Sequence, residues 1–402
     1  MKQIFPFSIN DPLPPVKHIE KITKYGYIDN GRNILDLSLG SCGCFPLGFT
    51  RTDIIESVNE QLKNSPFCQS DFVTSNNVVE ELSNKLYQLS KGYYPLYSLS
   101  GSDAIEGAVK LVQMYFKGTN KKKIIGFTHS YHGSTYMSTS VSGMESMINL
   151  FGKHSDCITI NHADIETAID ESIAAVFIET ASWGNNLEYT DKEYFKRLRI
   201  LCDKVGALLV IDDIAFCGGK TGTIFGFEAL DIQPDIFCVG KGISGGYYPL
   251  SATLCNQKVA NIIKSQFLLH GYSYSFPMPG MISTLEYLKV LEREQILEQH
   301  SNIVDRGNKL MDGLIQKGLI SSYNSFGVCY SIYPTHNLKH SGECDQIFYE
   351  QGLHSGLWNN ESSKILIMMP IVYDEDYFKE LEDKLVASLT VQKELSKSIL
   401  EV

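Results

Sequence analysis

Two short apolar runs in the middle of the chain each end in a polar residue. Residues 207–211 lead into Asp212, and residues 235–240 lead into Lys241, which a glycine-rich turn follows. Each run is short, apolar and bounded by turn residues, which is typical of a buried parallel strand. Because ligands of open α/β sheets bind outside the carboxyl ends of such strands, the pattern predicts that Asp212 and Lys241 share a site. The alternative is a surface lysine in a Gly-rich loop and a helix-capping aspartate.

The sequence around these runs alternates between helical and extended patterns. Residues 52–63 place Ile54, Ile55, Val58 and Leu62 on one helical face. Two further helices are expected, one over residues 77–89 and one that begins at Ser102, together with strands over 123–127, 157–160 and 174–178. The capping-box spacing of Thr190 and Glu193 predicts the start of another helix, and Gly206 predicts its end. This alternation, from about residue 53 to 265, predicts a parallel sheet with helices on both faces.

The two ends of the chain have a different character. Residues 1–50 are rich in Pro and Gly and predict a short, irregular lead segment. After His270 a long helix over about 280–299 is expected to continue into another up to about 318, followed by short strands and a charged helix from Asp374. We therefore predict an N-terminal segment (1–52) that joins a small α+β domain (280–402), and a large cofactor-binding domain (53–279).

Composition narrows the class of protein. The 402 residues are 43% hydrophobic and 20% charged, with a net charge of −11, and no basic cluster is long enough for a nucleic-acid footprint. No apolar stretch approaches a membrane span, and the first residues do not resemble a signal peptide. Ten cysteines without a CxxC pair indicate neither a metal site nor a disulfide framework. We expect free thiols in the cytoplasm.

An acid and an amine at one sheet edge suit pyridoxal 5'-phosphate (PLP). Its aldehyde needs a lysine Schiff base, and its ring nitrogen needs a carboxylate to stay protonated. The run from Ser100 to Ala104, at the start of a helix, offers backbone N–H groups and the Ser102 hydroxyl to a phosphate. Taken in isolation, Ser102 is better explained as a plain helix cap. Tyr131 is placed either to stack on an aromatic cofactor or to pack in the core.

Six segments in order resemble the class III (ornithine-type, subgroup II) PLP-dependent aminotransferases of fold type I. They are SGSDAIEGAVK at 100–110, YHG at 131–133, Glu179, DDIAFCGGKTG at 212–222, PDIFCVGKGISGGYYPL at 234–250 and HGYSYS at 270–275. They are similar to the family's SGSEANEAALK, YHG, EP, DEVQTGFGRTG, PDI..lgKglggG.pl and HGxT. The resemblance implies an α/β fold, with a mostly parallel sheet between helices and a smaller α+β domain.

The resemblance also implies residue roles. Lys241 would be the Schiff-base lysine and, once freed by substrate, a base whose pKa is lowered; Asp212 would partner the ring nitrogen. The other implied cofactor contacts are Gly101, Ser102, Tyr131, His132, Gly133, Glu179, Ile214 and Ser273. Ser273 stands where the family has a Thr that reaches the phosphate from the partner subunit, which implies a homodimer with shared active sites. The GKT at 219–221 is not a P-loop, because no Gly stands five positions before Gly219.

The departures from the family concern one contact to the cofactor ring and the binding of the substrate carboxylate. Ala215 replaces a Gln that helps hold the ring hydroxyl, and the C-terminal arginine that clamps a substrate carboxylate falls on or near Leu366. Arg306 is the last arginine in the chain. The clamp could come from Arg32, Arg51 or Lys364, the substrate could lack a carboxylate there, or this weakly matching region could be misaligned.

These observations lead to a functional expectation. The chain is expected to move an amino group, by a ping-pong mechanism, from a terminal-amine or diamino donor to a keto acid or aldehyde. One alternative is an aminomutase of the glutamate-semialdehyde type, which needs no second substrate. The other is a catalytically idle binding protein of the same fold, against which the pairing of Lys241 with Asp212 argues.

Overall fold

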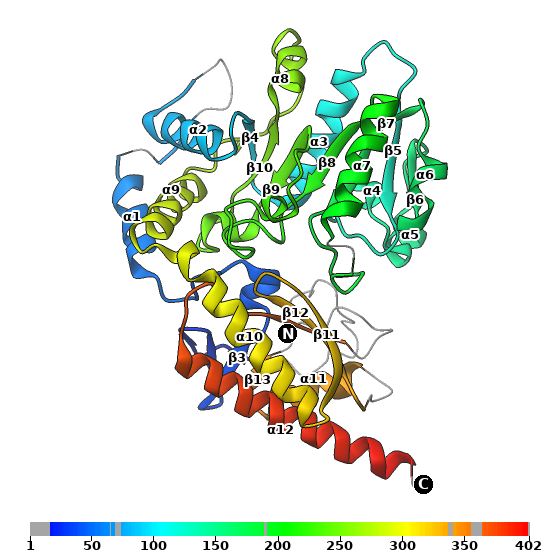
Figure 1. The fold of residues 1–402 in the computed structure, drawn as a ribbon. Coiled ribbons are helices and arrows are strands. Elements are labelled where there is room, and N and C mark those ends of the chain that lie inside the picture. The colour runs from blue at the N-terminus through cyan, green and yellow to red at the C-terminus, as the bar shows by residue number, and fades with distance from the viewer. Residues whose placement is uncertain are drawn as a thin grey trace.

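The computed structural model describes residues 17–64, 66–68, 74–188, 191–336, 341–354 and 364–400. Predictions for residues 1–16 and for Thr190 lie outside these residues. Figure 1 shows a large sheet flanked by helices and, below it, a smaller α+β part that carries helices α10 and α12. None of the described helices is both long and apolar enough to span a bilayer.

The large sheet has seven strands in the order β4-β10-β9-β8-β7-β5-β6. Strands β5 to β9 pair in parallel, and β10 is antiparallel to both of its neighbours. The mostly parallel α/β sheet is therefore confirmed. Its strands are β4 (Tyr94–Ser98), β5 (Lys123–Phe127), β6 (Cys157–Ile160), β7 (Ile173–Glu179), β8 (Leu208–Asp212), β9 (Ile236–Val239) and β10 (Ser251–Cys255).

Both faces of this sheet are buried. Along β8, Leu208 and Val210 pack in one apolar cluster with helix α3, while Leu209 and Ile211 pack in another with helix α7. Successive side chains of a strand point to opposite faces, so a continuous apolar run is what a strand covered on both sides requires. The helices before and within this layer are α1 (Thr52–Leu62), α2 (Asn77–Leu89), α3 (Gly101–Tyr115), α4 (Tyr136–Val141), α5 (Glu145–Phe151), α6 (Ile165–Ala168), α7 (Lys192–Val205) and α8 (Gln257–Lys264).

Helix α7 begins one residue later than the capping-box pattern predicts. Its N-cap is Asp191, whose side chain accepts the N–H of Tyr194 at 2.8 Å. Gly206 ends the helix in the left-handed conformation, as predicted. Short 3-10 or π turns complete the layer: η1 (Leu39–Gly43), η2 (His162–Asp164), η3 (Gly226–Leu230) and η4 (Lys241–Ser244).

The prediction of an irregular lead segment is wrong for the described part. Residues 21–36 form three antiparallel strands, β1 (Lys21–Thr23), β2 (Gly26–Asp29) and β3 (Arg32–Asp36), and β3 pairs in parallel with β13 (Leu353–His354). Asn30 and Gly31 both have positive φ between β2 and β3, as a two-residue hairpin turn requires. The N-terminal strands therefore share a sheet with a C-terminal strand.

The C-terminal helices are shorter and more broken than their pattern predicts. Helix α9 (Met278–Arg293) ends before Gln295, whose φ of 51° cannot continue a helix, and η5 (Ile296–Gln299) separates it from α10 (His300–Gln316). Met278 packs with the large sheet and Leu291 packs with the C-terminal part, so α9 joins the two cores. The domain boundaries stay a prediction. The remaining elements are β11 (Ile320–Phe326), β12 (Cys329–Pro334), α11 (Ser341–Glu350), β14 (Ile365–Met368) and α12 (Glu375–Leu400).

Candidate active site

Asp212 and Lys241 lie at the carboxyl ends of adjacent parallel strands. Asp212 is the last residue of β8 and pairs in register with Cys238 of β9, and Lys241 follows β9 after Gly240. Asp212 is buried, whereas Lys241 is half-buried and has a positive φ of 44°. The structure thus brings the two residues to one edge of the sheet, as the apolar runs predict.

Two groups hold the Asp212 carboxylate. His132 Nδ1 lies 2.8 Å from Oδ2, and the backbone N–H of Ile214 donates to Oδ1 at 3.1 Å. Burial acts to lower the pKa of His132, but its bond to Asp212 and the nearby Glu179 carboxyl outweigh burial and raise that pKa. His132 therefore lies behind Asp212 and supports the carboxylate, a placement that the YHG motif alone does not reveal.

Several titratable groups surround Lys241. Burial acts to lower the pKa of Lys241, but the thiols of Cys42 and Cys44 and then the carboxylates of Asp212 and Glu179 raise it, so the net shift is upward. Burial raises the pKa of the Cys44 thiol itself. The lowered pKa was predicted for the amine that substrate frees beside the cofactor's cation, and it stays a prediction.

The N-cap of helix α3 is Ser100, and the alternative that Ser102 is the cap is wrong. Ser100 is the N-cap and accepts the N–H of Asp103 at 3.3 Å, whereas Ser102 lies in the first turn. The Ser102 hydroxyl accepts the N–H of Ser134 at 3.0 Å, which ties the helix to the loop after Tyr131. The first-turn N–H groups of a helix have no intrahelical partners, so they remain available to a phosphate.

Two glycines allow close packing at this site. A Cβ at Gly133 would lie 2.4 Å from Ser102 Oγ, and a Cβ at Gly101 would lie 2.9 Å from Ile214 Cδ1. Larger residues would therefore displace the Ser102 or Ile214 side chain. The N–H groups of the helix start, a buried carboxylate and an amine fit the phosphate, ring nitrogen and aldehyde of PLP.

Replacing Gly133 by alanine should weaken cofactor binding about tenfold, equivalent to about 1.4 kcal/mol. The new Cβ displaces Ser102, and the φ of +129° adds strain of roughly 1–3 kcal/mol to the folded state. Gly152→Ala is the matched control, since Gly152 has a φ of +81° and nothing within 4 Å of its Cβ. Thermal unfolding and cofactor titration measure both effects. Equal affinities in the two variants would contradict the proposed contact.

Tyr131 and Glu179 complete the described cluster. The N–H of Tyr131 donates to Glu179 Oε2 at 3.4 Å, and the Tyr131 hydroxyl lies 3.0 Å from Ser134 Oγ. Burial raises the pKa of Glu179 to about 7, against the opposing effect of His132. Tyr131 is half-buried beside the anion site, as a residue that covers one cofactor face must be.

The predicted substrate-binding cations are engaged elsewhere. Arg51 pairs with Asp53 and with Glu294 Oε1 at 2.6 Å. Arg32 is exposed over the Tyr349 ring at 5.2 Å, and Lys364 Nζ lies 4.8 Å from the centroid of the Tyr333 ring. The other arginines of the chain, Arg197, Arg199, Arg293 and Arg306, also pair with carboxylates.

Ser273 lies away from these contacts. It is exposed on the loop between α8 and α9, and the hydroxyl of its neighbour Tyr272 accepts the N–H of Leu99 at 3.2 Å. The loop is therefore anchored next to the start of α3 while Ser273 points to the surface of this chain. Its predicted phosphate contact requires a second subunit.

The structure buries two further groups, Lys220 and Asp213, whose environment the sequence does not predict. Lys220 is 1% exposed and donates to the Cys217 carbonyl at 2.6 Å. Lys220 stands where the family segment GFGRTG has its arginine, and this match could have identified it from the sequence. Burial raises the pKa of Asp213 to about 8, and its carboxyl accepts the Thr180 hydroxyl and the N–H of Gly226, on the face of the strand away from Asp212.

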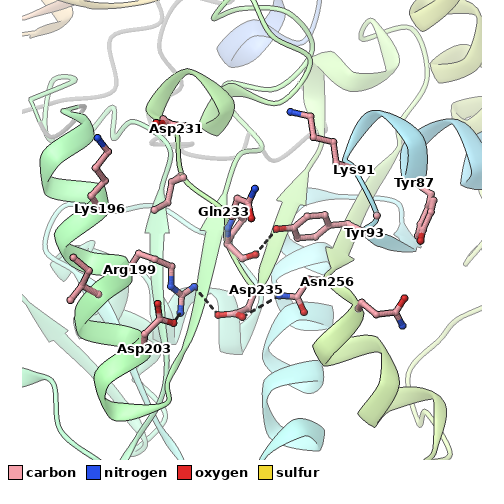
Figure 2. Close-up of a pocket in the computed structure, with 15 residues that line it drawn as sticks. Tyr87, Lys91, Tyr93, Lys196, Arg199, Asp203, Asp231, Gln233, Asp235 and Asn256 are labelled. Carbon is pink, nitrogen blue, oxygen red and sulfur yellow. Dashed lines mark hydrogen bonds and ion pairs between the residues drawn. The ribbon is translucent and has the colours of Figure 1, made fainter.

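A hollow of about 830 Å³ lies at the opposite edge of the sheet (Figure 2). Its wall includes Asp235, which precedes β9, whereas Lys241 follows that strand. Arg199 pairs with Asp235 and Asp203, each at 2.8 Å, and Asn256 donates to Asp235 at 3.2 Å. These side chains bond one another, with Arg199 Nε left without a partner, and the hollow does not belong to the candidate site.

Comparison with known proteins places these features in context. A family model described as aminotransferase class-III matches residues 20–389. Gamma aminobutyrate transaminase 2 of Solanum lycopersicum is 29% identical over 346 residues, 76% of this chain and 75% of that protein. Vanillin aminotransferase of Capsicum chinense is 28% identical over 345 residues, again 76% and 75%. Acetylornithine aminotransferase of Listeria monocytogenes is 28% identical over 323 residues, 79% of this chain and 80% of that protein.

Solved structures share the fold at lower identity. A transaminase from the marine bacterium Virgibacillus superposes with a TM-score of 0.90 over 98% of both chains, at 22% identity. The omega transaminase of Pseudomonas jessenii in complex with PMP has a TM-score of 0.89 over 98% of this chain and 97% of that one, at 20% identity.

Proposed function

Because this chain belongs to the class III aminotransferases, we propose that it moves an amino group from a terminal-amine or diamino donor to a keto acid or aldehyde by a ping-pong mechanism. Its cofactor is PLP, and its fold is that of the fold-type-I PLP-dependent transferases. The observation that carries the proposal is the convergence of Asp212 and Lys241 at one sheet edge, beside the anion site of α3.

Each residue of the site would have a separate role toward the cofactor. PLP supplies an aldehyde that reacts with amines and a conjugated ring that accepts electrons. The start of α3 and the Ser102 hydroxyl would bind its phosphate, and Asp212, supported by His132, would hold a proton on its ring nitrogen. The Lys241 amine would attach to the aldehyde and, when free, accept a proton from the donor carbon and return it.

The positions of the arginines support the proposed donor class. The chain has six arginines, of which five pair with carboxylates and Arg32 lies over Tyr349. A substrate carboxylate would have to compete with these partners, or rely on Lys364, whose point charge cannot form the bidentate pair of an arginine. The relatives named for γ-aminobutyrate and vanillin support a terminal amine and an aldehyde as reactants.

We expect an alkyl diamine to compete well with its α-carboxylated analogue as donor, and 2-oxoglutarate to bind poorly. Losing a bidentate charged pair costs about 1.5–3 kcal/mol. Half-reaction kinetics with the paired donors measure the donor preference. A transferase requires a second substrate and an aminomutase does not, so this requirement distinguishes the two reactions. A large preference for the carboxylated donor that survives Arg32→Ala, Arg51→Ala and Lys364→Ala would contradict the proposed donor class.

We also propose a homodimer with shared active sites. The loop that carries Ser273 exposes Phe267 at 84% and Leu269 at 82%, an apolar surface that a second subunit would cover. Sedimentation at micromolar concentration should give a dimer, and Phe267→Asp should dissociate it with loss of cofactor. A fully active monomer would exclude shared sites. Core thiols such as Cys217 and Cys329 support a reducing, cytoplasmic location.

A further inference from the structure

Lys220 is a buried lysine that lies against η4, the turn that carries Lys241. It is 1% exposed, and its Nζ donates to the Cys217 carbonyl at 2.6 Å. A Cβ at Gly242, the residue after Lys241, would lie 2.6 Å from Lys220 Nζ and 3.2 Å from the Cys217 oxygen. The Lys220 amine thus occupies the side of Gly242 where a side chain would stand, and its bond to Cys217 holds it there.

The stem and the backbone of Lys220 connect this contact with both ends of the chain. A Cβ at Gly43 would lie 2.9 Å from Lys220 Cε, so the stem packs against the turn η1. The Lys220 carbonyl accepts the N–H of Val328 at 2.9 Å, and His300 Nε2 lies 3.2 Å from the same oxygen. One residue therefore links the N-terminal and C-terminal parts of the chain to the turn of Lys241.

The turn η4 begins at a residue in an unfavourable conformation. Lys241 has a φ of 44°, in the left-handed region that residues with a side chain rarely adopt, so its surroundings must hold it there. The end of the turn is held by Ser283, whose Oγ donates to the Ser244 carbonyl at 2.7 Å. Near its start, Gly242 lies against Lys220 Nζ. The contact with Lys220 therefore acts on the half of the turn that carries the reactive amine.

We propose that Lys220 is a positioning residue for Lys241, which fixes the backbone of η4 so that the Lys241 amine meets the aldehyde of PLP in a reactive geometry. A misplacement of about 1 Å can cost about 10²-fold in rate, so a contact one residue away from the amine should have a measurable effect. Lys220 does not itself react with the aldehyde, because its amine is enclosed and bonded to Cys217. The inference rests on the proposed role of Lys241.

The test is the rate at which the full-length chain, freed of cofactor, captures PLP. The Lys241 amine condenses with the aldehyde, forms a C=N bond and releases water, and borohydride then reduces that bond so that peptide mapping locates it. Lys220→Met keeps an unbranched apolar stem but removes the N–H donor, so capture should slow about 10-fold to 100-fold. Pyridoxamine 5'-phosphate (PMP) cannot form this bond, and its affinity for Lys220→Met should stay near that for the wild type.

Lys121→Met is the matched control. Lys121 Nζ also donates to backbone carbonyls, those of Glu171 at 2.9 Å and Val205 at 2.5 Å, but it precedes β5 and does not contact η4. The control loses the same kind of hydrogen bond and should capture PLP at the wild-type rate. Gly242→Ala is a second variant, in which the new Cβ displaces Lys220 Nζ while the lysine remains, and it should also slow capture.

Slow capture with normal PMP affinity in Lys220→Met supports the positioning role. A wild-type capture rate overturns it, and so does a parallel loss of capture and PMP affinity, because Lys220 would then only stabilise the site as a whole. If Lys220→Met does not fold, Gly242→Ala decides by the same two measurements. Capture of PLP by the wild type on a lysine other than Lys241 contradicts the proposed function, whereas normal capture at Lys241 by Lys220→Met contradicts only the role of Lys220.

Discussion

Lys241→Ala should still bind PLP through its phosphate and ring but should lose the covalent bond and about 10²–10⁴-fold in turnover. Lys241 is the amine that the structure places beside Asp212 at the sheet edge, in a turn where its φ is 44°. Lys220 also lies near the Cys44 thiol, but its amine is enclosed and bonded to the Cys217 carbonyl. Borohydride reduction followed by peptide mapping locates the bond in the wild type.

The control for Lys241→Ala is Lys204→Ala, an exposed lysine at the end of α7. It should retain cofactor labelling and full activity. Borohydride-fixed cofactor on any peptide other than that of Lys241 would contradict the assignment of Lys241 as the Schiff-base lysine. Partial rescue of Lys241→Ala by added small amines would support the role of the amine as the base.

Asp212→Asn should bind PLP but transaminate about 10²–10⁴-fold more slowly, a barrier increase of about 3–5 kcal/mol. An amide cannot hold a proton on the ring nitrogen as a carboxylate does, so the ring accepts electrons less readily. His132 also loses the anion that raises its pKa, which should fall in the variant. Single-turnover kinetics and NMR titration of His132 measure the two effects.

Asp213→Asn is the control for the second prediction. Because burial raises the pKa of Asp213 to about 8, its carboxyl is mostly neutral at pH 7, and the amide resembles it. A flipped amide can accept the N–H of Gly226 and donate to the Thr180 hydroxyl. We expect activity near the wild type. Near-normal rates in Asp212→Asn would mean that the ring nitrogen has another partner.

Elements with a strong local pattern were predicted well. Helix α2 has the predicted ends, and the strands that lead to Asp212 and Lys241 pair in parallel at the centre of the sheet. Their apolar runs are continuous because both faces of the sheet are covered. The Asn30–Gly31 turn shows the opposite case: a hairpin signal was present, but the surrounding short strands carry too little periodicity to stand out.

The sequence by itself determined the family, the cofactor and the two residues at the strand ends, because these depend on local runs and on ordered motifs. Only the tertiary structure decided how the charges act. It placed His132 behind Asp212, enclosed Lys220, turned Asp213 away and engaged Arg51 with two carboxylates. It also paired Glu179 of β7 in register with Asp212 of β8. Burial and facing charges set protonation, and both arise only when distant segments pack together.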